Sequence, residues 1–318
     1  MTRARRIRCH PWRSKLVAVA ALAVSMSGLA GCSSNHASTS GPTGIILAVG
    51  AESQYANVLQ QIGGRFVSVS SILDNPNTDP HTFEASTSVA EEVADASLVV
   101  QNGIGYDTFM NQIEAASPNP DRKVIVAQHV MGLPDSTPNP HLWYDPKTMP
   151  AVAAAMAAAL GDLAPAHRAY FHARLTAFDA SLQPWLTAMT SFRAHHAGVR
   201  VAVTEPVADY MLQAMGADIV TPFTFQADIM NGVDPSPEAI TREEGLFTGH
   251  VAKVFCYNQQ VVSSLTTTIR QMAQTAGVPV VGVYETMPTP GYDYQSWMEA
   301  EVSAIRAAIE HGTSTEHL

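Results

Sequence analysis

Charged residues and cysteines are both scarce in this sequence, and each shortage excludes a class of protein. Only 14% of the 318 residues are charged and 46% are hydrophobic, whereas a typical soluble domain has about 25% charged residues. A disordered chain requires the opposite balance, so the sequence predicts a folded protein. Of the three cysteines, Cys9 lies in an N-terminal leader and Cys32 directly follows it, and Cys256 alone cannot form an intrachain disulfide. The fold must therefore be held together by its own core.

Basic residues are scarce in the body of the chain. Six of the 18 Lys and Arg residues lie in residues 1–31, which contain no Asp or Glu. The remaining 12 basic residues face all 28 acidic ones, so the net charge of the rest is −16. A body this acidic repels phosphate backbones, which argues against nucleic acid as a partner and leaves cations open as ligands.

Residues 1–31 have the pattern of an export signal. A basic segment precedes an apolar stretch at 16–30 that is too short to span a membrane and ends in small residues. The stretch runs into Leu-Ala-Gly-Cys, which resembles the bacterial lipobox, where the cysteine, here Cys32, is acylated and becomes the mature N-terminus. We therefore predict a lipoprotein signal peptide at 1–31 and a flexible tether at 32–44. The alternatives are an ordinary signal peptide with an incidental cysteine, or an uncleaved anchor.

This leader predicts the location of the protein. A lipid on Cys32 would hold the body outside the cytoplasm, on the cell membrane, either in the periplasm or at the cell surface. No other run of the sequence is long and apolar enough to span a bilayer.

The body of the chain divides into two α/β halves. Strand-like runs alternate with helix-like segments, which predicts βαβ units with mostly parallel sheets. The runs lie at 45–49, 66–72, 97–101 and 123–127, and the pattern restarts with 199–203, 254–257 and 278–283. The fold class is therefore α/β, with an N-terminal lobe at 45–164 and a C-terminal lobe at 197–318.

A single long helix is predicted between the lobes, over residues 165–196. Apolar residues spaced 4-3-4-3-4-3 put one stripe on a single face. They are Phe171, Leu175, Phe178, Leu182, Trp185, Met189 and Phe192. Pro165 suits the first turn, whereas Pro184 lacks an N–H inside the helix and predicts a kink. A stripe at this spacing is typical of core rather than of a cofactor site.

Two histidines and two glutamates stand where a binding site would form. His81 and His141 each follow a proline in a polar loop, which fixes the backbone and leaves the imidazole projecting. Glu205 and Glu285 each follow a strand-like run, and ligands of open α/β sheets bind beyond the carboxyl ends of strands. Each residue alone is more typical of an ordinary loop. Together they could close around one ion, with imidazoles suited to zinc, copper, iron or nickel and carboxylates to manganese, magnesium or calcium.

Five segments, in order, resemble the metal-binding receptors of ABC importers for zinc and manganese. They are DPHTFE at 79–84, LVVQNGIGYD at 98–107, NPHLWYDP at 139–146, TEP at 204–206 ahead of Tyr210, and DPSP at 234–237. The resemblance runs from about residue 45 to residue 310. It implies two α/β lobes joined by one long helix with the metal between them. It also implies a receptor rather than an enzyme, with ABC permease and ATPase subunits as partners.

The ligands implied by the resemblance are His81, His141, Glu205 and, in a looser match, Glu285. Glu84 is expected to be a hydrogen-bonding partner of a ligand rather than a ligand itself. Asn139 stands where the second motif usually has Asp. The hydrogen bond that orients the His141 ring would therefore be lost or made otherwise.

The donor set leaves the identity of the metal open. Two imidazoles and two carboxylates are a harder set than three imidazoles, which favours Mn²⁺ or Fe²⁺, whereas the Irving–Williams order favours Zn²⁺. We expect one divalent transition metal, Zn²⁺ or Mn²⁺ with Fe²⁺ as a further candidate, carried as the transported ligand. We also expect a monomer.

Other classes of protein fit parts of the pattern. A metal-dependent hydrolase would need an open coordination position, but the sequence has no His-Glu-x-x-His and no Gly-x-Ser-x-Gly. A metal-binding adhesin or a metallochaperone could use the same fold. His195 and His196 could bind a metal at the surface, although imidazoles near the end of a helix are common.

Overall fold

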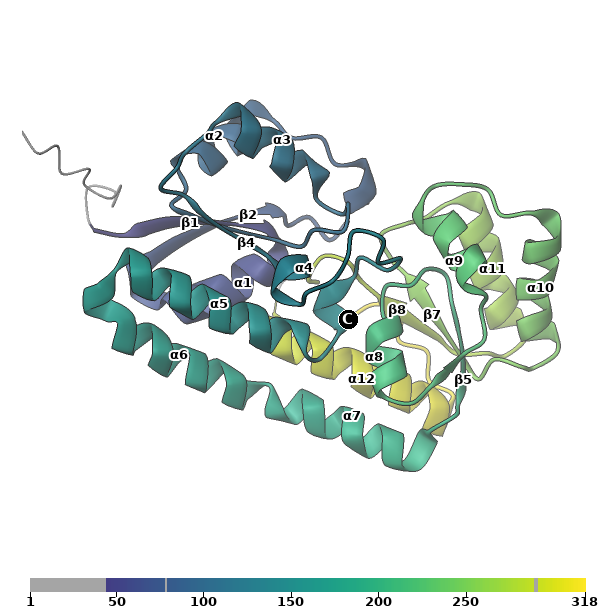
Figure 1. Cartoon of the computed structure of the whole chain (residues 1–318). Helices are drawn as coiled ribbons and strands as arrows, with labels where there is room; N and C mark the ends of the chain where they lie inside the picture. The colour runs from purple at the N-terminus through teal and green to yellow at the C-terminus, as the bar shows by residue number, and fades with distance from the viewer. Residues whose placement is uncertain (1–43, 78, 289–290) are drawn as a thin grey trace, which may run out of the picture. The chain divides into compact units, whose positions relative to one another are not determined.

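The computed structural model describes residues 44–77, 79–288 and 291–318. Residues 1–43 contain the predicted signal peptide, Cys32 and nearly all of the predicted tether, and they lie outside the described residues. In the described chain, helices and strands alternate, and the strands form two four-stranded parallel sheets (Figure 1). The predicted fold class, two α/β lobes with parallel sheets, is confirmed.

The N-terminal sheet has the order β2-β1-β3-β4. Its strands are β1 (Ile46–Glu52), β2 (Val67–Leu73), β3 (Leu98–Gln101) and β4 (Lys123–Val126). The helices of this lobe are α1 (Ser53–Gly63), α2 (Thr87–Asp95), α3 (Thr108–Ala116), α4 (Ala127–Val130) and α5 (Thr148–Leu163). Helices α1 and α5 lie on one side of this sheet and α2 and α3 on the other (Figure 1). Alternate strand residues face opposite sides: Ala48 and Val100 pack with α1 and α5, and Val49 and Val99 pack with α2 and α3.

The C-terminal sheet repeats that order as β6-β5-β7-β8. Its strands are β5 (Arg200–Val203), β6 (Asp218–Ile219), β7 (Val254–Asn258) and β8 (Val280–Val283). The helices are α8 (Asp209–Ala214), α9 (Phe223–Met230), α10 (Pro237–Thr248), α11 (Ser264–Thr275) and α12 (Tyr294–His311). Ala202 and Phe255 pack with α9, α10 and α11, while Val203 and Cys256 face the core that α12 shares.

Both sheets have a point where the strand order reverses, between β1 and β3 and between β5 and β7. The chain leaves the first strand on one side and returns on the other, and the crevice this creates is where open α/β sheets bind ligands. Glu205 follows β5 and Asn258 ends β7, so the C-terminal crevice carries a carboxylate and an amide side by side.

The predicted helix over 165–196 is divided into two. A short 3-10 turn, Pro165–His167, leads into α6 (Arg168–Ser181), and α7 (Gln183–His196) follows after Leu182. Pro184 cannot donate to the carbonyl four residues back, so the helical ladder is interrupted there. Leu182 keeps helical dihedral angles (φ −76°, ψ −15°). The interruption is therefore a local break, and α6 and α7 lie end to end (Figure 1).

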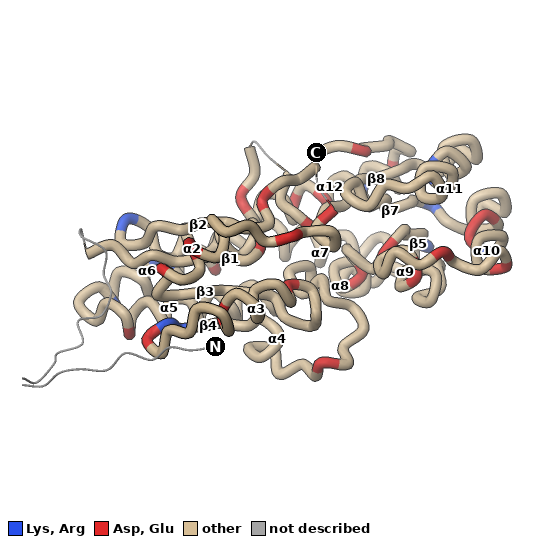
Figure 2. Tube along the Cα trace, turned by 90° about the horizontal axis from the view of Figure 1, so that it is seen from above, with Lys and Arg blue, Asp and Glu red and all other residues tan. Residues whose placement is uncertain are grey.

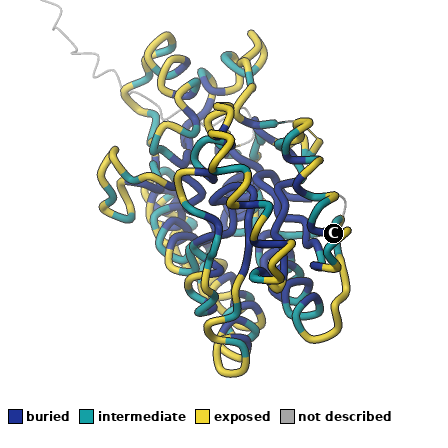
Figure 3. The backbone as a smooth tube through the Cα atoms, turned by 90° about the vertical axis from the view of Figure 1, so that its right-hand side faces the viewer, coloured by how far each residue is buried: buried dark blue, intermediate teal, exposed yellow. Residues whose placement is uncertain are grey.

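One hydrophobic core runs through both lobes. It contains strand residues of both sheets together with α5, the stripe on α6 and α7, and α12. Six of the seven stripe residues are buried and Leu175 is partly buried. Trp185 packs edge-on against Tyr294 of α12, at 5.9 Å between ring centroids. Buried backbone forms a continuous interior in Figure 3. This core continues across the predicted lobe boundaries at 164 and 197, so it does not mark where one lobe ends and the next begins. The two boundaries therefore stay predictions.

The excess of acidic residues and the lack of a membrane-spanning segment, both expected from the sequence of the body, are also seen in the described chain. Acidic residues are spread over both lobes and basic residues are few (Figure 2). In residues 44–77, 79–288 and 291–318, no helix combines the length and apolar character needed to cross a bilayer.

Candidate metal centre

Three of the four predicted ligands come together between the two sheets. His81 lies in a 3-10 turn (Pro80–Thr82) after β2, His141 lies just before another (Leu142–Tyr144), and Glu285 follows β8. One ligand atom from each lies within 4.8 Å of the others, and no other group of three His, Cys, Asp or Glu residues in the described chain does so. The prediction drew these residues from separate segments, and the fold brings them to one point.

The Glu285 carboxylate is the centre of this cluster. Its Oε2 atom accepts a hydrogen bond from the Tyr106 hydroxyl (2.9 Å) and lies 3.2 Å from His81 Nε2 and 3.3 Å from His141 Nε2. Its Oε1 atom accepts from the Asn258 amide (2.7 Å). Burial alone would raise the pKa of Glu285, but the imidazoles of His141 and His81 hold it well below its usual range. The site thus contains a buried carboxylate in its ionised form.

Asn139 fixes the tautomer of His141. Its amide nitrogen donates to the Pro206 carbonyl (2.7 Å), so its oxygen must be the atom that faces His141 Nδ1 (2.8 Å). His141 therefore carries a proton on Nδ1, and a neutral ring then keeps the lone pair on Nε2. Burial lowers the pKa of His141, which favours that neutral ring. In this neutral state two acceptors, His141 Nε2 and Glu285 Oε2, face each other at 3.3 Å. A protonated ring would instead donate from Nε2 to the carboxylate, which is the interaction that lowers the pKa of Glu285.

His81 is the solvent-accessible edge of the cluster. Its side chain is 25% exposed, while those of His141 and Glu285 are fully buried. The Asp79 carboxylate accepts from the His81 backbone N–H (2.8 Å) and caps the turn. Burial alone would lower the pKa of His81, but the bond and charge of Glu285 raise it. Glu84 is exposed and has no hydrogen bond or ion pair with the described residues, so Asp79 is the acid that holds this turn.

Glu205 lies beside the cluster rather than within its closest group. It is only 1% exposed, and its Oε1 atom accepts from the same Asn258 amide that binds Glu285 (3.2 Å). Its Oε2 atom has no hydrogen-bond partner among the described residues. Burial and then the negative charge of Glu285 raise the pKa of Glu205 well above its usual range. The structure therefore places a second buried acid next to the first, with one oxygen free.

Sequence reasoning missed three residues that hold this arrangement. Asn258 ends β7, where the rule about strand ends would have found it, and Tyr106 stands in the Asn-Gly-x-Gly segment. Gln260 accepts from the backbone N–H groups of Glu285 (2.6 Å) and Thr286 (2.8 Å), and no sequence signal marks it. Together they fix the backbone and both oxygens of Glu285.

The loop that carries Tyr106 is strained. Ile104 has a φ of +53°, between Gly103 (+86°) and Gly105 (+75°). A left-handed conformation costs a β-branched residue about 1–3 kcal/mol, and it persists only where the surroundings enforce it. Here the Ile104 N–H donates to the Gln128 side chain (2.7 Å). This strained turn aims the Tyr106 hydroxyl at Glu285.

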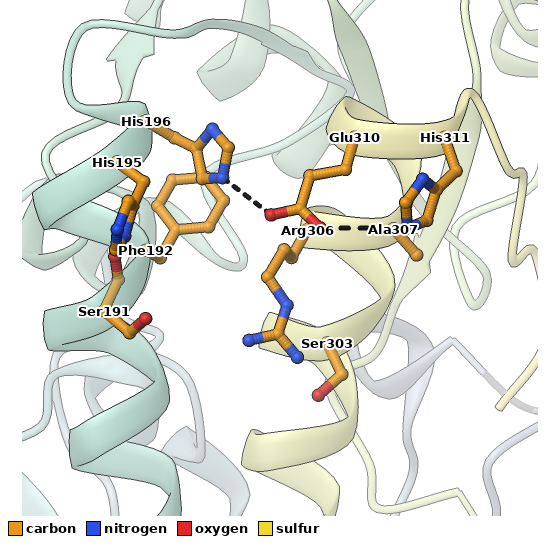
Figure 4. A pocket seen from close by; sticks show the side chains of 9 residues that line it. All are labelled: Ser191, Phe192, His195, His196, Ser303, Arg306, Ala307, Glu310 and His311. Carbon is orange, nitrogen blue, oxygen red and sulfur yellow. Dashed lines mark hydrogen bonds and ion pairs between the residues drawn. The ribbon is translucent and has the colours of Figure 1, made fainter.

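The histidines at the end of α7 form a different, surface arrangement. His196 Nε2 lies 3.0 Å from one Glu310 oxygen, and His311 Nε2 lies 3.8 Å from the other (Figure 4). His195 Nδ1 lies 2.8 Å from the Ser191 carbonyl, one turn back on its own helix. The ligand atoms do not converge as those of the central cluster do. The structure thus gives His196 an ion-pair role rather than a preformed metal site.

The central cluster has the chemistry of a cation site. Its inward-facing atoms are imidazole nitrogens and carboxylate oxygens, and no Lys or Arg forms an ion pair with Glu205 or Glu285 in the described chain. Buried negative charge without a cation is costly, and transition metals prefer this donor set.

Glu205→Gln should stabilise the metal-free protein. Its free carboxylate oxygen is buried beside the charge of Glu285, and a neutral amide removes that repulsion. We expect the free energy of unfolding at pH 7 to rise by about 1–3 kcal/mol, measured by denaturant titration after chelation. Glu84→Gln removes the same charge from an exposed side chain and should change stability by less than about 0.5 kcal/mol. Equal effects of the two substitutions would contradict the electrostatic account.

Comparison with known proteins identifies the family of this chain. Residues 49–308 match the family described as zinc-uptake complex component A, periplasmic. A putative metal-binding protein of Thermotoga maritima is 29% identical over 92 residues, which cover 29% of this chain and only 32% of that relative.

Solved structures share the fold at low sequence identity. The periplasmic zinc-binding protein TroA of Treponema pallidum has a TM-score of 0.70 and 17% identity over 84% of this chain and 99% of its own. The SBP FpvC of Pseudomonas aeruginosa in complex with Mn²⁺ has a TM-score of 0.67 and 21% identity over 84% and 99%. Since the family match covers most of the described residues, the chain belongs to the family of zinc-uptake complex component A proteins, as its motifs predicted.

Proposed function

We propose that this protein is an extracytoplasmic receptor that captures one divalent transition metal, zinc or manganese, and delivers it to an ABC importer. The contact that supports this best is the one between His141 Nε2 and Glu285 Oε2, two buried acceptors 3.3 Å apart. A divalent cation between them would replace a repulsive contact by two coordinate bonds. A family named for an uptake complex supports a receptor rather than a hydrolase.

The proposed ligands are His81, His141 and Glu285, with Glu205 as the fourth. The first three already converge within 4.8 Å. Glu205 shares the Asn258 amide with Glu285 and has a free oxygen, so turning its side chain toward the cluster would complete a four-ligand shell. Asn139 and Asp79 would hold the two histidine loops while the metal binds.

The metals named for similar structures support a divalent transition ion. TroA is named as a zinc-binding protein, FpvC is in complex with Mn²⁺ or Ni²⁺, and a periplasmic metal-binding protein of Candidatus Liberibacter asiaticus is bound to Mn or Cd. In this chain the two carboxylates favour Mn²⁺, or Fe²⁺ as a further candidate, and the Irving–Williams order favours Zn²⁺. The protein would carry the metal as a transported ligand and not as a catalytic cofactor.

The lipid anchor is also a proposal. Acylation of Cys32 would tether the receptor to the membrane beside its permease, through about ten flexible residues with a reach near 5–6 Å × √n, where n is the number of residues.

An adhesin or a metallochaperone could have the same metal site but would not work with an importer. Loss of cellular metal uptake on deletion of the protein therefore distinguishes the receptor from both.

Apo protein prepared with a chelator should bind one equivalent of Zn²⁺ or Mn²⁺. His141→Ala should weaken binding by about a hundredfold or more, because the remaining buried charges lose their counter-ion and a ligand. Competition titration with both metals gives the affinity and the preference. His195→Ala, on the surface of α7, is the matched control and should bind like the wild type. Unchanged affinity in alanine variants of all four proposed ligands would rule the site out.

Cys32→Ser should abolish lipidation. We expect the variant to remain as an uncleaved precursor or to be released from the membrane fraction, because acylation requires the thiol. Fractionation and gel migration of the two forms test this. A variant that fractionates and migrates like the wild type would refute the lipobox interpretation.

A further inference from the structure

A tyrosine outside the proposed ligand set lies between the two ligand-bearing segments. Tyr144 comes three residues after His141, and its hydroxyl lies 2.8 Å from the backbone carbonyl of Tyr284, the residue before Glu285. The Tyr284 N–H also donates to this hydroxyl (3.3 Å). Tyr144 is fully buried. One phenol therefore joins the segment of His141 to the segment of Glu285.

The same hydroxyl lies 2.7 Å from Glu301 Oε1 on α12. A phenol has one proton and two lone pairs. If Glu301 were ionised, its oxygen and the Tyr284 carbonyl would compete for that one proton. The oxygen that did not receive the hydrogen bond would face a lone pair of the phenol oxygen at close range. If Glu301 carries a proton, it donates to Tyr144, and Tyr144 donates to Tyr284. The phenol then uses its proton and both lone pairs.

The surroundings of Glu301 favour the protonated acid. It is fully buried, and its Oε2 atom has no partner among the described residues. Its Oε1 atom accepts from the Trp297 indole (2.7 Å), which opposes protonation. Burial raises the pKa of Glu301 to about 8, against the hydrogen bonds of Tyr144 and Trp297. The titratable groups that interact with it are Tyr144 and Tyr284 and, on β7, the Cys256 thiol. None of these is a cation.

We propose that Tyr144 is a positioning residue for the metal centre, and that the proton held by Glu301 directs the Tyr144 hydroxyl to the Tyr284 carbonyl. This inference rests on the proposed function. A hydrogen-bond chain from Glu301 to Tyr144 to Tyr284 would then connect the segment of His141 with the segment of Glu285, next to the proposed metal site. When pH rises above about 8, Glu301 ionises and accepts a hydrogen bond from the Tyr144 hydroxyl. The short bond to the Tyr284 carbonyl is then lost, and only the 3.3 Å bond from the Tyr284 N–H still joins the two segments.

The test compares Tyr144→Phe with Tyr294→Phe. Tyr294 is equally buried, and its hydroxyl donates to the Trp143 carbonyl (2.6 Å), so both substitutions remove a buried bond to a carbonyl. Tyr144→Phe also removes the contacts with Glu301 and with the Tyr284 N–H. Only Tyr144 joins the two ligand-bearing segments. Zn²⁺ affinity by chelator competition at pH 7 should fall about tenfold in Tyr144→Phe and stay within about twofold of wild type in Tyr294→Phe.

A second measurement separates positioning from mere packing. Glu301→Met cannot take the Tyr144 proton, so Tyr144 donates to Tyr284 at every pH. The ratio of wild-type to Glu301→Met affinity for Zn²⁺ should be near one at pH 7 and should fall by up to about tenfold at pH 9. Taking the ratio at each pH cancels the effects of hydroxide and of ligand titration. If Tyr144→Phe does not fold, the change of this ratio between pH 7 and pH 9 tests the proposal without that variant.

Equal affinities of Tyr144→Phe and Tyr294→Phe would overturn the inference, as would a wild-type to Glu301→Met ratio that does not change between pH 7 and pH 9. Both results leave the proposed function intact, because the wild type binds metal in each. A wild type that binds no metal fails at the earlier step and refutes the proposed function itself.

Discussion

The centre of this protein depends on one buried, ionised carboxylate. Glu285 is removed from water, and a carboxylate in that position is stable only if donors surround it. Those donors come from both lobes, with Tyr106 and His81 on one side and Asn258 on the other. Holding them together fixes the ends of strands that are far apart in the sequence. The contact with His141 stays unfavourable while its Nε2 atom is unprotonated, and that residual repulsion is what a cation would remove.

The core determines how such a site can open. One hydrophobic cluster continues from the N-terminal sheet through α5, α6, α7 and α12 to the C-terminal sheet, so separating the lobes would expose apolar surface. His81 keeps an accessible edge, whereas His141 and Glu285 do not. The structure therefore favours entry past the His81 turn, with small side-chain and loop movements inside and the long helical side of the molecule left intact.

Elements that have a regular pattern of apolar residues could be predicted from the sequence. The parallel strands and the apolar stripe of α6 and α7 were predicted, and the break near Pro184 falls at Leu182. Helix α5 was missed because its alanine-rich sequence has little contrast between faces, and β6 has only two residues. In the candidate site, His81, His141 and Glu285 were predicted from loop and strand-end positions, and the structure brings them together. Asn139 proved to orient the His141 ring itself. Gln260 and the chain from Glu301 to Tyr284 depend on long-range packing that no local pattern reports.

Anomalous diffraction from crystals of metal-loaded protein, measured at the zinc or manganese absorption edge, tests the central claim most directly. The account predicts one strong peak between the lobes, about 2.0–2.3 Å from the Nε2 atoms of His81 and His141 and from a Glu285 oxygen, with Glu205 turned toward it. A loaded crystal with no peak among these atoms, or with its main peak at His196 and Glu310, would contradict it.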